Sequence, residues 1–481
     1  MDINTVHADE HYQLIEFSGL KLGWNSAENL AWEYHSMIRP TFQVWVCYII
    51  LALFKSLGVA DPYILSFILR LITVFLSIFG IYFFYSRSKS MLPVNSHFIY
   101  ACLSFFIWFI PFASVRFSSE TWSGILFLIG LSFLFGEDNY SKRNSYLAGL
   151  FTGLSFLCRF QTGFMIVGMV AWLIFVKKYS LSKLADVIVP IFTVIQIGVA
   201  LDSVFYGEYV VTFWKYFKAN IIEDVASNYG VSPWWTILVY LIKQPLLPIG
   251  ILIVLSYVIV SVGSVKSPVV WCTLPFILVH TLIPHKELRF LFPLVWFVPF
   301  TIMLAITQVL TLKRFFTVKY LRIINIGMLG IAGLLIILNT AALAQSISTP
   351  VGYRQKWLSK KIRDDFKGNP VKILHTSYGN PIEPWPILDE KFYSEENISY
   401  QKIDHQEDIE KYTTISSDTI YLLGVRRFDG LNSSLVRFDS LEIKELYTTD
   451  PEMDILPIGL SGDRNTNYFI IRSISRRHEQ I

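Results

Sequence analysis

The stretch YILSFILRLITVFLSIFGIYFFY, residues 63–85, decides the fold class, because it is a long apolar run that carries only one charge, Arg70. A helix that crosses a lipid bilayer needs about 20 mostly apolar residues. Further apolar runs follow this one, near residues 97–112, 121–136, 145–158, 162–176, 186–201, 238–260, 268–284, 290–311 and 321–345. We therefore predict an all-α polytopic membrane protein with about 10 to 12 transmembrane helices, since helices satisfy their own backbone groups in lipid.

The composition supports this class. Apolar residues make up 53% of the 481 residues and charged residues 16%, against about 25% charged in an average soluble domain. Residues 1–350 hold 23 basic and 16 acidic side chains, and residues 351–481 hold 18 and 21. The composition and this split exclude a soluble enzyme and a disordered protein. They also exclude a nucleic-acid binder, because no basic groove for phosphates is implied. We expect a lipid bilayer and no nucleic acid among the partners.

The cysteines predict neither a metal site nor a disulfide framework. They are widely spaced in apolar stretches, at Cys47, Cys102, Cys158 and Cys272. Zinc sites and redox motifs need close pairs of the CxxC type. We interpret all of them as packing residues, and we expect no bound metal and no cofactor.

The last part of the chain has the pattern of a small soluble domain. Strand-like runs at residues 371–376, 419–425 and 468–474 alternate with polar, turn-rich connections. Residues 351–481 are numerous enough to build their own core. We predict an α/β or α+β domain there.

Basic residues predict the topology. Cytoplasmic loops of membrane proteins are rich in Lys and Arg. Five alternate loops hold 12 basic residues, whereas the four short loops between them hold six. If the five are cytoplasmic, the segments around Glu120, Arg159, 202–237 and 284–289 lie on the outer or luminal side together with residues 351–481.

The run TFQVWVCYIILALFKSLGV, residues 41–59, has two interpretations. As an ordinary transmembrane helix it leaves the N-terminus in the cytoplasm; as a re-entrant or interfacial helix it leaves residues 1–62 on the outer side. We favour the second, because the polar motifs below then share one side. The domains are then an extracytoplasmic acidic segment, 1–62, a transmembrane domain, 63–345, and an extracytoplasmic soluble domain, 351–481.

Ionisable residues beside membrane spans are costly and are candidates for function. The first cluster is HADEHYQ, residues 7–13, with the adjacent carboxylates Asp9 and Glu10. A partly desolvated carboxylate has a raised pKa and can take a proton from a hydroxyl nucleophile. The segment therefore predicts a general base, and the alternative is a solvated tail.

The second cluster is RFSSE, residues 116–120, between two apolar runs. A binding role for Arg116 and Glu120 is one interpretation. The other is helix capping, with Ser118 or Ser119 as the N-cap and Glu120 in the first turn.

The remaining two clusters combine aromatic and cationic side chains. Segment 202–237 carries Tyr and Trp residues that suit either membrane anchoring or stacking on a sugar ring. HKELRF, residues 285–290, places His285, Lys286 and Arg289 on the side where positive charge is otherwise depleted. A lipid phosphate explains this exception, since Arg can grip a phosphate with two parallel hydrogen bonds.

Taken in order, these segments resemble the dolichyl-phosphate-mannose-dependent mannosyltransferases of glycosyltransferase family 22, which extend lipid-linked oligosaccharides and GPI anchors. The resemblance is carried by HADEHYQ (7–13), AWEYHSMIRP (31–40), RFSSE (116–120), DSVFYGE (202–208), NYGVSPWW (228–235) and HKELRF (285–290). HADEHYQ is similar to the family's H-x-D-E-x-x-Q segment, and HKELRF is close to its HKE-x-RF signature. The segment after Arg159 reads RFQT, where an RPT-like sequence is common in the family.

The resemblance implies a GT-C fold and an inverting, metal-independent transfer of mannose or another hexose from a polyprenyl-phosphate donor to a glycan or glycolipid hydroxyl. Carried over to this chain, Asp9 is the expected base and Glu10 its neighbour in orienting the acceptor. The donor phosphate is expected at His285, Lys286 and Arg289. The residues expected to line the same cavity are Arg116, Glu120, Tyr229 and Trp234.

Two alternatives stay open at this point. The enzyme can use another polyprenyl-phosphate sugar, such as glucose, arabinose or aminoarabinose, because no residue identifies the sugar. The chain can instead be a transporter or flippase for a lipid-linked sugar. We expect a multi-pass protein of the bacterial inner membrane, or of the endoplasmic reticulum in a eukaryote, with its active site on the periplasmic or luminal side.

Overall fold

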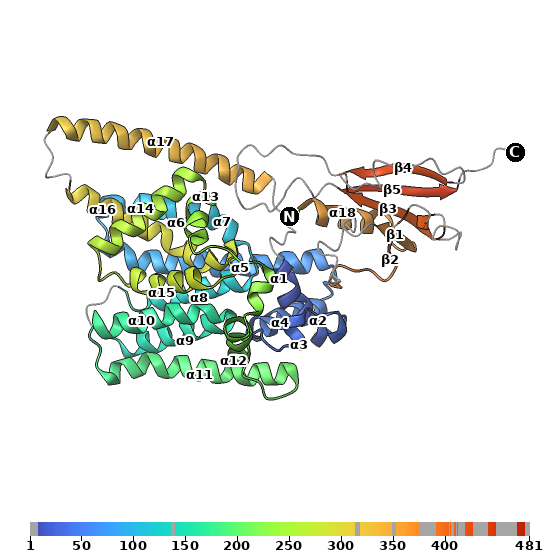
Figure 1. Ribbon diagram of the computed structural model, residues 1–481, viewed down its shortest axis with the longest axis horizontal. Coiled ribbons are helices and arrows are strands. Elements are labelled where there is room, and N and C mark those ends of the chain that lie inside the picture. The colour runs from blue at the N-terminus through green and yellow to red at the C-terminus, as the bar shows by residue number, and fades with distance from the viewer. Residues whose placement is uncertain are drawn as a thin grey trace.

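The computed structural model describes residues 8–135, 140–312, 318–348, 353–375, 391–403, 405, 408–409, 411, 419–426, 441–448 and 469–476 (Figure 1). Asp9 lies on a described helix, but its side chain is outside the described part.

Every apolar run predicted from the sequence forms a helix or a helix pair. The helices are α1 Ala8–His11, α2 Phe17–Leu22, α3 Trp32–His35, α4 Phe42–Ser56, α5 Pro62–Ser88, α6 His97–Phe106, α7 Phe109–Ser114, α8 Ser119–Ser132, α9 Lys142–Cys158, α10 Gly163–Phe175, α11 Leu181–Tyr206, α12 Thr212–Phe217, α13 Thr236–Lys243, α14 Leu247–Gly263, α15 Pro268–Leu282, α16 Val298–Leu312, α17 Val318–Ser348 and α18 Tyr353–Asp365. A π-helical segment, Tyr12–Glu16, joins α1 to α2.

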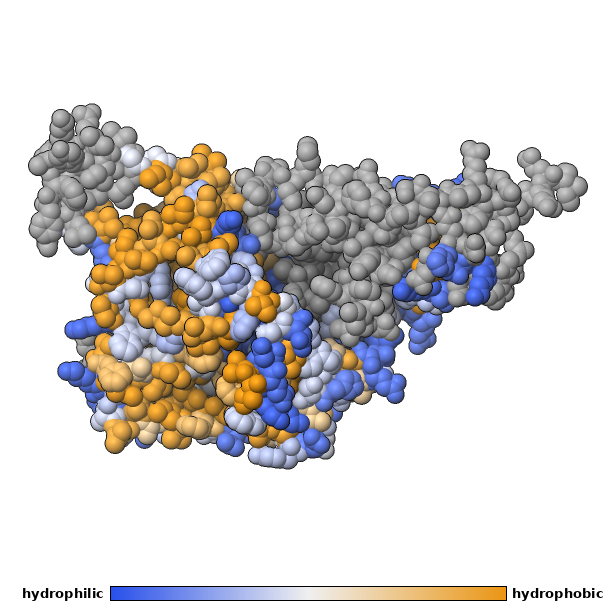
Figure 2. Space-filling model, viewed as in Figure 1, coloured by the Kyte–Doolittle hydropathy of each residue, from blue (hydrophilic) through white to orange (hydrophobic). Residues whose placement is uncertain are grey.

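The helical body contains several helices that are long and apolar enough to cross a membrane. Within the described residues, the helices long and apolar enough to cross a bilayer are Pro62–Met91, Leu181–Tyr206, Leu288–Thr311 and Leu329–Ser346, and α14 with α15, bent by 119°, makes a fifth candidate if it counts as one span. Figure 2 shows a broad apolar band on this body with hydrophilic residues at its two ends. The remaining helices are shorter or broken, so the predicted number of crossings stays a prediction.

Helix α4 covers the ambiguous run and is short. Its 15 residues correspond to about 22 Å, less than the hydrocarbon core of about 30 Å. Figure 1 shows α1 to α4 together at the end of the helical body that also carries the C-terminal sheet. Both features support the interfacial interpretation of this run, which stays a prediction.

Asp202 fastens the N-terminal segment to α11. Its carboxylate accepts hydrogen bonds from the backbone N–H and the hydroxyl of Thr41, each at 2.7 Å. Tyr206, one turn further along α11, donates to the backbone carbonyl of Arg39 at 2.9 Å. Gly207 then ends the helix with a φ of 80°, which glycine adopts without strain. The motif DSVFYGE therefore has a structural role: its Asp202 and Tyr206 position Arg39 and the start of α4.

Close packing of α9 against α11 depends on glycine. A Cβ atom on Gly149 would lie 2.2 Å from the carbonyl oxygen of Val187, and one on Gly198 would lie 2.3 Å from the side chain of Leu157. Small residues are what allow membrane helices to approach so closely. This pair of helices supports Arg159, which follows α9 directly.

The C-terminal domain is a mixed sheet with one helix against it. The strands are β1 Val371–His375, β2 Ile398–Lys402, β3 Ile420–Arg426, β4 Leu441–Thr448 and β5 Phe469–Arg476. Their order is β2-β1-β3-β5-β4. The pairs of β1 with β2 and β3 are parallel, and those of β5 with β3 and β4 are antiparallel. Leu358 and Ile362 of α18 pack on one face of the sheet. The three strand-like runs read from the sequence are confirmed as β1, β3 and β5.

This domain is fastened to the N-terminal helices. Arg363 of α18 forms an ion pair with Asp61 at 2.6 Å, just before α5 begins. The backbone N–H of Phe392 donates to Glu16 at 3.0 Å, and the ring of Tyr393 stacks on His11 with 5.5 Å between centroids. Residues 392–393 therefore pack directly against the segment that follows Asp9.

We predict that Gly149→Val lowers the thermal midpoint of the purified protein by several degrees. The new side chain collides with the backbone of α11, and overpacking of this kind costs about 1–3 kcal/mol. Gly333→Val is the matched control, because nothing lies within 4 Å of a Cβ atom at that position of α17. Equal midpoints for the two variants, measured in the same detergent, would contradict the packing role.

Candidate functional site

The predicted acidic segment begins the site. Asp9 lies in α1, and the next residue, Glu10, has a buried side chain. One carboxylate oxygen of Glu10 lies 3.5 Å from Nη1 of Arg116. The guanidinium of Arg116 also covers the ring of Phe112 at 4.2 Å. The structure thus brings together one predicted catalytic residue and one predicted cavity residue, and their pairing explains how both charges are buried.

A second carboxylate holds this segment in shape. Glu16 is 1% exposed. It contacts Nε2 of His11 at 2.6 Å and accepts a hydrogen bond from Asn25 at 2.7 Å. With the bond from the backbone of Phe392, these contacts tie the turn that follows Asp9 to the C-terminal domain.

A third carboxylate, Glu33 on α3, organises the side of the site nearest to α4. Gln13 donates to it at 3.0 Å and Arg39 at 3.2 Å. Glu33 belongs to the motif AWEYHSMIRP, to which the sequence analysis gave no residue roles. The structure supplies one: Glu33 holds Gln13 and Arg39 beside each other.

Glu120 is the point where the other motifs meet. It is buried in the first turn of α8. Its Oε1 lies 2.7 Å from Nη1 of Arg159 and 3.5 Å from Nη1 of Arg289. Ser118 caps the helix by accepting from the backbone N–H of Thr121 at 3.2 Å. The capping interpretation is therefore confirmed for Ser118, while Glu120 pairs with two arginines from other segments.

HKELRF folds around its own carboxylate. Glu287 contacts His285 at 2.8 Å and Arg289 at 2.5 Å. The other ring nitrogen of His285 lies 2.9 Å from the carbonyl oxygen of Gly230. Since both neighbours are acceptors, both contacts are hydrogen bonds only when the ring is the doubly protonated imidazolium.

Lys286 points back into the protein. Its ammonium group donates to the carbonyl oxygens of Ile283 at 2.5 Å and Ser232 at 3.1 Å. Burial lowers its pKa from the ordinary value, because desolvation disfavours the charged form. These bonds join the HKELRF loop to residues 230–232, so Lys286 holds the two loops together in this structure.

The two predicted aromatic residues lie at the surface. The ring of Tyr229 is near His285, with 6.2 Å between centroids, and stacks on Trp32 at 6.3 Å. Trp234 is 64% exposed and makes an edge contact with Trp235. Neither residue lines the pocket described next, and their roles stay predictions.

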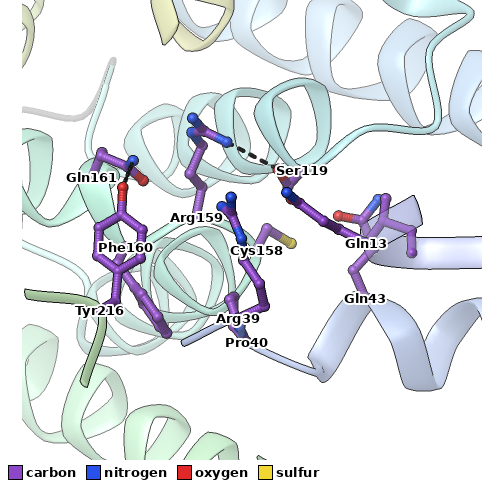
Figure 3. Close-up of a pocket in the computed structure, with 11 residues that line it drawn as sticks. Gln13, Arg39, Pro40, Gln43, Ser119, Cys158, Arg159, Phe160, Gln161 and Tyr216 are labelled. Carbon is purple, nitrogen blue, oxygen red and sulfur yellow. Dashed lines mark hydrogen bonds between the residues drawn. The ribbon is translucent and has the colours of Figure 1, made fainter. Parts of the chain in front are cut away.

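A pocket with about 400 Å³ of empty space, part of it open to solvent, lies beside these pairs. It is lined by Gln13, Leu14, Arg39, Pro40, Gln43, Ser119, Cys158, Arg159, Phe160, Gln161 and Tyr216. Figure 3 shows Gln13 and Gln43 on one side and Gln161 and Tyr216 on the other, with Arg39 and Arg159 between them. Gln13 follows the Asp9 turn and Ser119 precedes Glu120, so the pocket adjoins both predicted clusters.

Sequence reasoning missed several of these lining residues. Arg39 lies in a quoted motif but was given no role, and Gln43 lies inside an apolar run. Gln161 and Tyr216 come from different segments and meet through a hydrogen bond between the amide and the phenol. A polar amide in the apolar run was the one signal that could have found Gln43.

The chemistry available here is electrostatic and acid–base. Within the described residues, no group of three or more His, Cys, Asp and Glu side chains is arranged to hold a metal ion. Carboxylates and cations from separate segments instead meet at one end of the helical body. Such an arrangement can bind an anionic group and activate a hydroxyl.

We predict that Glu120→Gln lowers the thermal midpoint markedly. The change removes the carboxylate between two guanidinium groups, and breaking a buried ion pair costs about 3–5 kcal/mol. Replacing both partners, as in Glu120→Gln with Arg159→Gln, should recover part of the loss. Glu208→Gln is the control, because that carboxylate is 59% exposed and lies 3.8 Å from the ammonium group of Lys215, whose side chain is 40% exposed. A Glu120→Gln midpoint equal to that of the control would contradict the role of the pair.

Comparison with known proteins identifies the family and the fold of the chain. A family model described as the Alg9-like mannosyltransferase family matches residues 2–383. GPI mannosyltransferase 3 of Yarrowia lipolytica is 26% identical over 328 residues, 67% of this chain and 62% of that protein. GPI alpha-1,2-mannosyltransferase 3 of Bos taurus is 22% identical over 300 residues, 60% of this chain and 53% of that protein. The chain thus matches less than two thirds of the length of each of these relatives.

Among solved structures, a crystal structure of ArnT from Cupriavidus metallidurans bound to undecaprenyl phosphate is similar, with a TM-score of 0.54. The similarity covers 97% of this chain and 93% of ArnT at 11% identity, and therefore shows the fold alone. The expected GT-C fold, with a small C-terminal sheet domain, is confirmed. Since the family model covers most of the chain, this protein belongs to the Alg9-like mannosyltransferase family.

Proposed function

We propose that the protein is a membrane mannosyltransferase that moves a hexose, mannose first of all, from a polyprenyl-phosphate donor to a hydroxyl of a glycan or glycolipid. The observation that carries the proposal is the meeting of RFSSE and HKELRF at Glu120, beside Arg159 and a pocket. The names of the relatives support mannose. The lipid bound to ArnT supports a polyprenyl-phosphate donor.

In this proposal, Asp9 is the general base. It takes the proton from the acceptor hydroxyl while that oxygen attacks the anomeric carbon of the donor sugar. The bond from the anomeric carbon to the phosphate oxygen breaks, polyprenyl phosphate departs, and the configuration inverts. Glu10, held by Arg116, keeps the segment that carries Asp9 in place and orients the acceptor.

The departing phosphate gains negative charge, which cations in a partly buried site stabilise more strongly than they do in water. His285 and Arg289 are the groups we propose to contact it. Lys286 joins them by exchanging a carbonyl contact for the phosphate, and its loss of hydration makes that exchange favourable. Tyr229, close to His285, and Trp234 offer aromatic surface for a sugar or lipid. The active site is proposed to face the periplasm or the lumen.

We predict that Asp9→Asn lowers the rate of transfer by a factor of about 10² to 10⁴, the usual contribution of a general base. The assay compares polyprenyl-phosphate mannose with GDP-mannose, both radiolabelled, in an extract that contains candidate lipid and glycan acceptors. Asp224→Asn is the matched control, because it makes the same isosteric change at an exposed residue of segment 202–237. Equal thermal midpoints would show that both variants fold.

Four outcomes would contradict parts of the proposal. Full activity of Asp9→Asn would remove this residue from the mechanism, and transfer from GDP-mannose alone would remove the lipid donor. Transfer only from another polyprenyl-phosphate sugar, such as glucose or aminoarabinose, would correct the hexose. Movement of the donor lipid across a vesicle bilayer without transfer would support the transporter alternative.

A further inference from the structure

Gln43 is a buried amide to which the described residues offer no partner. It lies in the first turn of α4 and is 1% exposed. Neither its amide nitrogen nor its amide oxygen has a hydrogen-bond partner in the described part of the chain. Burying an amide without partners lowers stability. An apolar residue, as in most of α4, would avoid this cost, so the amide indicates a ligand.

The surroundings of Gln43 indicate the class of ligand. Gln43 lines the pocket described above. The two guanidinium groups in that pocket are each matched by a carboxylate, Arg39 by Glu33 and Arg159 by Glu120. The charges of these pairs cancel, and the pocket therefore favours a neutral ligand over an anion.

An amide is chemically matched to a hydroxyl. It offers one acceptor oxygen and an N–H donor, and a hydroxyl both donates and accepts. A phosphate at neutral pH is almost entirely an acceptor and leaves the amide oxygen unpaired. Phe160 and Tyr216 add ring surface to the pocket, which suits the C–H groups of a pyranose.

We propose that Gln43 binds a hydroxyl group of a hexopyranose ring in this pocket and helps to select the sugar. The proposal deepens the proposed function and rests on it for the sugar chemistry. The ring can belong to the donor or to the acceptor, because both carry the same hydroxyl chemistry. Gln43 belongs to none of the motifs that carry the family resemblance.

The test uses the full-length protein in lipid nanodiscs and the variant Gln43→Leu. The probes are methyl α-D-mannopyranoside, methyl α-D-glucopyranoside and the monodeoxy derivatives of each. We expect Gln43→Leu to bind the preferred glycoside about tenfold more weakly, the effect of losing a hydrogen bond in a desolvated site. One monodeoxy derivative should bind the wild type about tenfold more weakly than the parent glycoside does. The same derivative and its parent should bind Gln43→Leu equally well.

A stability measurement separates binding from a structural role. If Gln43 serves a ligand, Gln43→Leu should leave the thermal midpoint unchanged or raise it, because an unpartnered amide is removed. Gln345→Leu is the matched control, as Gln345 is another buried glutamine, on α17, that does not line the pocket. A lower midpoint for Gln43→Leu with unchanged glycoside binding would overturn the proposal. Absence of binding of both glycosides to the wild type would overturn it too.

Kinetics of transfer distinguish the two sources of the sugar. A raised KM for the acceptor alone assigns the ring to the acceptor, and a raised KM for the polyprenyl-phosphate donor alone assigns it to the donor. Transfer that is unaffected by Gln43→Leu overturns this inference and leaves the proposed function standing. Glycoside binding that depends on Gln43, in a protein that transfers no sugar, overturns the proposed function and leaves a hexose site.

Discussion

The ion pairs of Glu120 with Arg159 and Arg289 are the interaction on which the site depends. A single buried carboxylate binds guanidinium groups from the end of α9 and from the 3₁₀ helix Leu288–Phe297 that follows α15. Burying any one of these charges alone would cost a large desolvation free energy, and pairing with the opposite charge offsets that cost. The pairing therefore fixes three distant segments of the chain relative to one another. It also sets one wall of the pocket, because Arg159 lines the pocket and donates a hydrogen bond to Ser119, another lining residue, at 3.2 Å.

Glu16 does the same for the acidic segment. It binds His11, Asn25 and the backbone of Phe392, so the turn after Asp9 is shaped partly by the C-terminal domain. That domain is also fastened through Arg363 to Asp61. The C-terminal sheet domain is thus connected to the segment proposed to carry the base.

The sequence allowed the fold class, the sheet domain and the main motifs to be predicted, because each leaves a local signal. Apolar runs gave the helices, alternating runs gave β1, β3 and β5, and HKELRF gave His285, Lys286 and Arg289. Ser118 as an N-cap was available from the same kind of signal. Strands β2, ISYQK, and β4, LEIKELYT, are too polar to be identified by their apolar content.

Partners across long sequence distances leave no such signal. Nothing near Glu33 indicates that it binds Gln13 and Arg39, and nothing near Asp202 indicates Thr41. Lys286 was expected to hold a phosphate because of its charge, yet in this structure its ammonium group binds two carbonyl oxygens. Composition gave the charge of the loop, and only three-dimensional packing determines where each charge points.

The distribution of charge separates the candidate site into two parts. In the pocket, Glu33 and Glu120 match Arg39 and Arg159, so that part is close to neutral. Around HKELRF, Glu287 contacts both an imidazole and a guanidinium. The two hydrogen bonds of Lys286 described above go to backbone carbonyl oxygens and not to a carboxylate. Positive charge is therefore in excess at the loop and balanced in the pocket. If the ring proposed to bind at Gln43 belongs to the donor, this difference favours one orientation of the donor, with its phosphate toward HKELRF and its sugar toward Gln43.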